Sequence, residues 1–99
     1  MSDIRDHARI CDELRELYVQ KNGDYGDSFH KSWEDYGITV AAIRIGDKYN
    51  RLRNITAGNA VPGVSGETVQ DTLLDLANYA IMSVMEMEAQ EYGDFVPWD

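Results

Sequence analysis

The segment from Glu67 to Tyr79, ETVQDTLLDLANY, constrains the fold of this chain more than any other stretch. At 3.6 residues per turn, it places four polar side chains along one line of a single helix: Glu67, Asp71, Asp75 and Asn78. Most other positions of this helix are apolar. A stripe of carboxylates on a helix otherwise built for burial costs free energy unless positive charge lies against it. Either basic side chains or a metal ion must therefore satisfy the stripe.

The size and charge of the chain narrow the possible functions. It has 99 residues, of which 43% are hydrophobic and 27% charged, as in an ordinary folded domain. A core of this size gains from self-association, so we expect one domain over residues 1–99 that forms a homo-oligomer, a dimer or larger. The formal net charge of −9 argues against binding to a nucleic-acid polymer. A small basic cluster could still hold one phosphorylated metabolite.

The sequence carries no sign of export or of membrane insertion. Its single cysteine, Cys11, cannot form an intrachain disulfide, which suits a reducing compartment. The N-terminal sequence MSDIRDHAR lacks the apolar core of a signal peptide. No apolar run approaches the ~20 residues that a membrane span needs. We expect a cytoplasmic protein without a membrane partner.

The hydrophobic periodicity predicts an all-α fold, because no segment has a convincing strand pattern. Three main helices in an antiparallel bundle are expected, the first capped by Ser2 or Asp3 and the third by Ser65. The first helix is expected to end at about Gln20. The second helix should run from about Thr39 to Leu52 or Ile55, and the third helix should end at about Tyr92. A loop from Thr56 to Gly66 precedes the third helix, and a short tail, 93–99, follows it.

The first connection, from Lys21 to Gly37, is long and rich in aromatic residues. A connection of this length usually packs on its own or has a functional role. Phe29, Trp33 and Tyr36 can share one side of a short helix between Ser28 and Asp35. In the tail, Phe95 and Trp98 are expected to dock on the body or on a neighbouring subunit, which agrees with completion of the fold by oligomerisation.

Two interpretations of the acidic stripe remain open. Asp71 and Asp75, one helical turn apart, can bind Mg²⁺ through oxygen, and Glu67 extends the set. Alternatively, the carboxylates pair with cations of the second helix, as in many helix–helix ion-pair networks. The two interpretations are compatible if the cations hold phosphate while Asp47 joins the metal ligands.

The second helix carries those cations on one face. Arg44, Asp47, Lys48 and Arg51 fall at i, i+3, i+4 and i+7. Arginine makes bidentate contacts with phosphate, and lysine adds a point charge. The face is therefore a candidate for phosphate binding, and a solvated charged face is the alternative.

The sequence KNGDYG, from Lys21 to Gly26, is a third candidate. Its glycines let backbone N–H groups approach a ligand, Tyr25 can stack on a base, and Lys21 can reach phosphate. Asp24 and Tyr25 would then close over the sugar or base. The alternative is a helix C-cap followed by a turn.

The blocks KNGDYGDSF, IRIGDKYNRL and ETVQDTLLDLANYAI, taken in this order, resemble a small phage and bacterial family, the nucleotide-modification-associated domain. The resemblance covers about Leu17 to Met82. This family in turn looks like a relative of the MazG-like all-α nucleoside triphosphate pyrophosphohydrolases. The resemblance implies a helical, oligomeric, Mg²⁺-dependent enzyme that cleaves between the α and β phosphates and releases a monophosphate and pyrophosphate.

The MazG-like enzymes hold Mg²⁺ with a Glu-x-x-Glu pair on one helix and a Glu-x-x-Asp pair on a later helix. By resemblance, the later helix corresponds to Glu67, Asp71 and Asp75, although their spacing is i, i+4. The earlier pair has no clean match, because the corresponding helix offers only Asp47. A Glu-x-x-Glu spacing occurs at positions 13 and 16, but on the first helix.

The first functional hypothesis is Mg²⁺-dependent pyrophosphohydrolysis of a (deoxy)nucleoside triphosphate. It assigns catalysis to Asp71 and Asp75, and metal binding to Asp47, Glu67, Asp71 and Asp75. It assigns substrate binding to Lys21, Asp24, Tyr25, Arg44, Lys48 and Arg51. The alternatives are a non-catalytic module that binds or sequesters a nucleotide, and a helical assembly protein whose stripe is a structural salt-bridge network.

Overall fold

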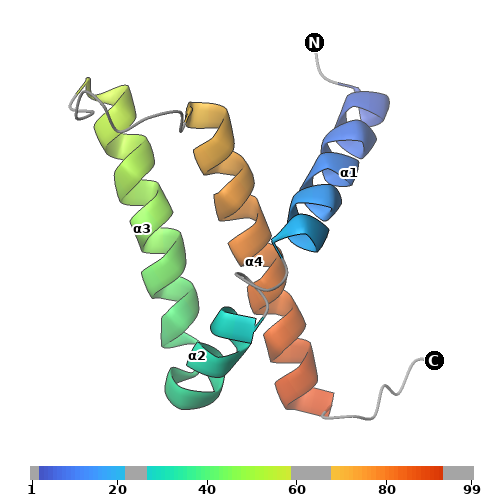
Figure 1. Ribbon diagram of the computed structural model, residues 1–99, viewed down its shortest axis with the longest axis vertical. Coiled ribbons are helices and arrows are strands. Elements are labelled where there is room, and N and C mark those ends of the chain that lie inside the picture. Colours follow the sequence, from blue (N-terminus) through green and yellow to red (C-terminus); the bar gives the residue numbers. More distant parts are fainter. Residues whose placement is uncertain (1–2, 22–26, 59–67, 93–99) are drawn as a thin grey trace.

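The computed structural model describes residues 3–21, 27–58 and 68–92, and every regular element in these ranges is a helix. Figure 1 shows the four helices, α1 (Ile4–Gln20), α2 (Ser28–Tyr36), α3 (Thr39–Thr56) and α4 (Val69–Tyr92). The predicted all-α class is confirmed, and α1, α3 and α4 are the three main helices expected. The short helix expected in the aromatic connection is α2. None of the described helices is long and apolar enough to cross a membrane.

Local sequence sets the start of α1 and the turn between α2 and α3. The carboxylate of Asp3 accepts hydrogen bonds from the backbone N–H groups of Arg5 and Asp6, at 2.9 and 3.0 Å, so Asp3 is the N-cap of α1. Ser2, the other candidate, lies outside the described residues. Gly37 ends α2 with a φ of 68°, a conformation that glycine adopts without steric cost. Because its N–H bonds to the Trp33 carbonyl at 2.7 Å, the chain turns at once into α3.

The start of α4 differs from the prediction. The helix begins at Val69, and Thr68 caps it, so the prediction of Ser65 as N-cap is wrong; Ser65 itself lies outside the described residues. Thr68 Oγ1 accepts from the Asp71 N–H at 3.0 Å, and the Asp71 carboxylate accepts from the Thr68 N–H at 3.1 Å. These two bonds form a capping box, with aspartate in the place where glutamate is usual.

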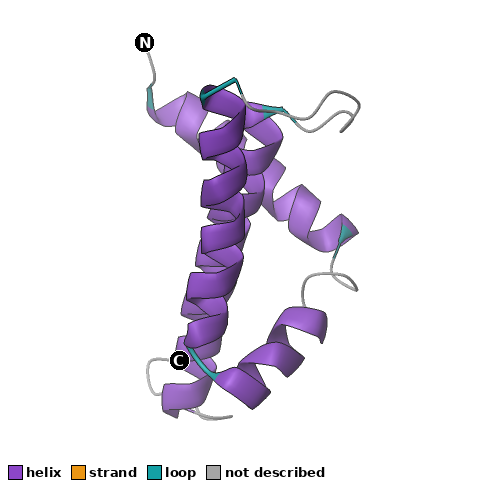
Figure 2. Ribbon diagram, turned by 90° about the vertical axis from the view of Figure 1, so that its left-hand side faces the viewer, coloured by secondary structure: helices purple, strands orange, loops and turns teal. Residues whose placement is uncertain are grey.

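The helices do not form a closed three-helix bundle. The antiparallel pair α3–α4 makes most of the contact between helices, and α2 lies across the beginning of α3 (Figure 1). Helix α1 lies beside α4, on the side away from α3, and is inclined to it, so that its C-terminal half approaches α4 (Figures 1 and 2). Accordingly, α1 contains no buried residue. The predicted antiparallel arrangement therefore holds for α3 and α4, whereas α1 projects from the pair.

The core lies where α2 meets α3 and α4. Its fully buried apolar side chains, within the described residues, are Phe29, Trp33, Val40 and Met82. The Phe29 ring lies 5.8 Å from that of Trp33, measured between centroids. Tyr36 lies on the same helix as these aromatics, as predicted, but it is the last residue of α2, beside the turn at Gly37, and is 71% exposed, so it is not part of the core. The expected docking of Phe95 and Trp98 concerns the tail, which lies outside the described residues.

Candidate functional site

Asp75 lies at the centre of a charged cluster between three segments of the chain. It projects from α4 with a side chain that is only 16% exposed. Its Oδ2 lies 3.2 Å from the Nζ of Lys48 on α3, and its Oδ1 lies 3.9 Å from the Nζ of Lys21, the residue that follows α1. A half-buried carboxylate in a helix interior needs a cation. Within the described residues, Asp75 therefore has cations from two other segments of the chain as partners.

The two lysines differ in how firmly they are held. The side chain of Lys48 is 20% exposed, and its ion pair with Asp75 has hydrogen-bonding length. The side chain of Lys21 is 46% exposed, and its distance of 3.9 Å is that of a loose surface pair, the kind that contributes little to stability. An ammonium group has three donors, so one lysine can contact more than one anion at the same time.

The residues of the predicted acidic stripe make different contacts in the structure. Asp71 takes part in the capping box of α4. Asn78 is 2% exposed, and its Nδ2 donates to the Leu14 carbonyl at 3.2 Å, which fastens α1 to α4. Glu67 lies outside the described residues. Only Asp75 of the stripe contacts cations of other segments in the part of the chain that is described.

The basic face of α3 is directed only partly toward α4. Arg44 and Lys48 are half-buried on the side that packs against α4, whereas Asp47 and Arg51 are exposed. Arg44 and Arg51 lie one turn before and one turn after Lys48. The two other residues predicted to bind substrate, Asp24 and Tyr25, lie outside the described residues.

A Mg²⁺ site does not form from the described residues alone. Within residues 3–21, 27–58 and 68–92, no group of three or more His, Cys, Asp or Glu side chains could hold a metal ion. Asp75 contacts two lysines, and Asp71 caps its own helix. The predicted set of Asp47, Glu67, Asp71 and Asp75 therefore depends on Glu67 or on acids from elsewhere.

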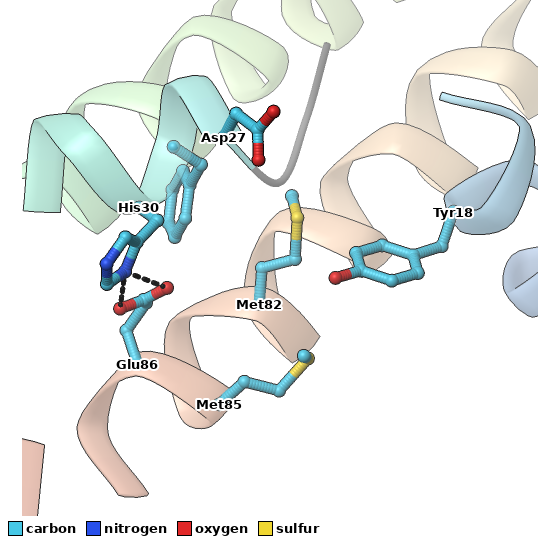
Figure 3. Close-up of a pocket in the computed structure, with 7 residues that line it drawn as sticks. Tyr18, Asp27, His30, Met82, Met85 and Glu86 are labelled. Atoms are coloured by element: carbon cyan, nitrogen blue, oxygen red, sulfur yellow. Dashed lines mark hydrogen bonds and ion pairs between the residues drawn. The ribbon is translucent and has the colours of Figure 1, made fainter. Parts of the chain in front are cut away.

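A second polar pair, which the sequence did not reveal, lies about ten residues further along α4. His30 of α2 contacts the Glu86 carboxylate through Nδ1, at 2.8 and 3.1 Å (Figure 3). Its Nε2 lies 3.4 Å from Glu34. The hydrogen bond and charge of Glu86, with smaller contributions from Glu34 and Asp27, raise the pKa of His30. The pair is 56 residues apart in sequence, so only the docking of α2 on α4 brings it together.

A cavity of about 250 Å³ opens beside this pair. It lies between the C-terminal end of α1, the start of α2 and the middle of α4 (Figure 3). Among the described residues, four apolar or aromatic side chains and three polar ones line it: Tyr18, Phe29, Met82, Met85, Asp27, His30 and Glu86.

Fold and site together define a small all-α protein with a cluster of two lysines and one aspartate where three segments meet. The model of one family, nucleotide modification associated domain 1, matches residues 21–87, more than half of the chain. The chain belongs to this family, which confirms the resemblance seen in the sequence. The match spans Lys21, Lys48, Asp75 and the His30–Glu86 pair. Comparison with the curated proteins and with the solved structures gives no match.

Proposed function

We propose that this protein binds a nucleotide and that the cluster of Lys21, Lys48 and Asp75 holds its phosphate groups. One observation carries the proposal. Two lysines from distant parts of the chain converge on one half-buried carboxylate, at 3.9 and 3.2 Å, within a domain associated with nucleotide modification. An ammonium group makes charge-assisted hydrogen bonds to phosphate oxygens, so two of them at one position favour the binding of an anion there.

The arginines of α3 extend this site. Arg44 and Arg51 flank Lys48 by one turn on either side, and guanidinium groups bind phosphate oxygens in bidentate fashion. A triphosphate, with several anionic groups in a row, can contact more of these cations than a monophosphate. Asp24 and Tyr25, which follow Lys21 directly in the sequence, remain our candidates for contacts with the sugar or base.

Isothermal titration with the common nucleoside triphosphates, repeated with Mg²⁺ and with a chelator, tests the proposal. We expect at least one of them to bind without added metal and to raise the melting temperature by several degrees, since a ligand at 100 times its Kd adds about 2.7 kcal/mol of stability. If none of them binds and none raises the melting temperature, nucleotide binding is wrong and the cluster is a structural ion pair.

Mg²⁺-dependent pyrophosphohydrolysis of a (deoxy)nucleoside triphosphate is a second candidate. It is favoured by the family association and by the position of Asp71 and Asp75, one turn apart on α4. It requires Glu67, Asp47 or acids of a second subunit to complete the acidic set. Release of pyrophosphate during incubation with Mg²⁺ supports this candidate. Recovery of the intact nucleotide from a tight complex supports the binding module instead.

We also propose that the protein forms a homo-oligomer through the outer face of α4. This face, opposite the core, exposes five apolar side chains by 37–55%: Val69, Leu73, Ile81, Val84 and Met87. A helix that is apolar on both sides is typical of the interior of an assembly. Because the exposed stripe runs along most of α4, a second copy of the chain can cover it with the same stripe, as a two-fold interface requires.

Val84→Glu is expected to make the protein monomeric at concentrations where the natural sequence forms an oligomer. A charge at the centre of an apolar interface loses its water without gaining a partner. Light scattering coupled to size-exclusion chromatography measures the mass of each. Val19→Glu, the same substitution at a 67%-exposed position of α1, is the matched control and should leave the mass unchanged. A natural protein of about 11 kDa in solution would contradict the proposal.

A further inference from the structure

The cavity between α1, α2 and α4 is matched in size to a single ring system. Its volume is about 250 Å³. Pockets for drug-sized ligands span ~300–1,000 Å³, so this one is small for a whole nucleotide. A purine or pyrimidine base with part of its sugar is a ligand of suitable size.

The walls of the cavity suit a flat, aromatic ligand. Phe29 and Met82 form buried apolar surface, each only 3% exposed. Tyr18 and Met85 add to the apolar lining from α1 and α4 (Figure 3). Aromatic rings stack on bases, and the polarisable thioether of methionine packs well against ring edges and faces.

The polar side of the cavity presents a fixed acceptor. The Glu86 side chain is 17% exposed, and His30 holds its carboxylate at 2.8 and 3.1 Å. A carboxylate has about four acceptor positions, and one imidazole N–H does not fill them. Glu86 can therefore accept a hydrogen bond from a ligand while His30 keeps its orientation. An exocyclic amino group, as on adenine or cytosine, is the matching donor.

The position of the cavity relative to the charged cluster fits one ligand that spans both. Met82 follows Asp75 by seven residues, about 10 Å along α4. On α1, Tyr18 precedes Lys21 by three residues, one helical turn. The two sites thus share two segments of the chain and are separated by a distance that a sugar and its phosphates can bridge.

From this arrangement we infer that the cavity binds the base of the nucleotide and that Glu86 selects bases with an exocyclic amino group. The inference rests on the proposed function, because the phosphates of the same nucleotide lie at Lys21 and Lys48. Bases that present a carbonyl oxygen in place of the amino group put an acceptor against the carboxylate and are disfavoured.

Titration with two matched pairs of nucleotides tests the selection. ATP and ITP differ in the amino or keto group of the purine, and CTP and UTP differ likewise in the pyrimidine. In at least one pair, we expect the amino nucleotide to bind at least about tenfold more tightly than the keto nucleotide. The reason is that the keto nucleotide lacks the hydrogen bond to the charged carboxylate of Glu86. Equal affinity within both pairs, or preference for the keto members, overturns the inference.

Two variants separate the base site from the phosphate site. Met85→Trp places a large side chain at a 45%-exposed position of the cavity wall, so it should weaken nucleotide binding at least about tenfold and leave pyrophosphate binding unchanged. Glu86→Gln should reduce the amino-over-keto ratio at least fivefold, whereas the matched control Glu88→Gln should not. If Met85→Trp leaves nucleotide affinity intact, the base lies elsewhere. If neither nucleotides nor pyrophosphate bind the natural protein, the proposed function itself is wrong.

Discussion

Trp33→Ala is expected to lower the free energy of unfolding by about 3–5 kcal/mol, the usual cost of removing a large aromatic side chain from a core. Trp33 is 5% exposed and belongs to the small set of fully buried apolar residues in the described part of the chain. Domains of this size have a total stability of about 5–15 kcal/mol. The variant should therefore unfold at a much lower urea concentration, measured by far-ultraviolet circular dichroism because the substitution removes a fluorescent tryptophan.

Tyr36→Ala provides the matched control on the same helix. Tyr36 lies three residues after Trp33, but its side chain is 71% exposed. A surface substitution of this kind should change the free energy of unfolding by no more than about 0.5 kcal/mol. If the two variants lost equal stability, α2 would not be docked through Phe29 and Trp33 as the structure has it.

The helices were predictable because their signals are local. The cap at Asp3, the apolar periodicity and the glycine after Tyr36 each act within a few residues, and these set the limits of α1, α2 and α3 closely. The start of α4 was misplaced although its signal was present. The pattern Thr68-x-x-Asp71 is itself a capping-box sequence, and it was interpreted as part of an acidic stripe.

The site was predictable only where one helix faces another along its whole length. The stripe on α4 and the basic face of α3 were expected to meet, and the Lys48–Asp75 pair is such a contact. The position of Lys21 on the same carboxylate depends on how α1 crosses α4, which no periodicity specifies. His30 and Glu86 meet only because α2 docks at one particular angle, so no spacing in the sequence could indicate their pairing.

Lys48→Met is expected to weaken nucleotide binding about 10- to 100-fold. The substitution keeps the length of the side chain but removes its charge, and a hydrogen bond to a charged group is worth about 1.5–3 kcal/mol, or one to two factors of ten in Kd. Lys48 is the less exposed of the two lysines at Asp75, so solvent screens its charge less than that of Lys21. Isothermal titration with the triphosphate that binds the natural protein most tightly measures the change. Lys31→Met, at an exposed position of α2, is the control and should leave Kd within threefold.

Asp75→Asn distinguishes the two candidate functions. If the lysines bind phosphate, removing the competing carboxylate makes the local net charge more positive, and nucleotide affinity without metal should stay within threefold or increase. If Asp75 instead supports a Mg²⁺-dependent reaction, the same substitution should abolish pyrophosphate release. A loss of metal-free binding as large as that in Lys48→Met would contradict the proposed phosphate site, because it would mean that the carboxylate contacts the nucleotide itself. The sign of this one effect therefore decides whether Asp75 competes with the phosphate for the lysines or contacts the ligand itself.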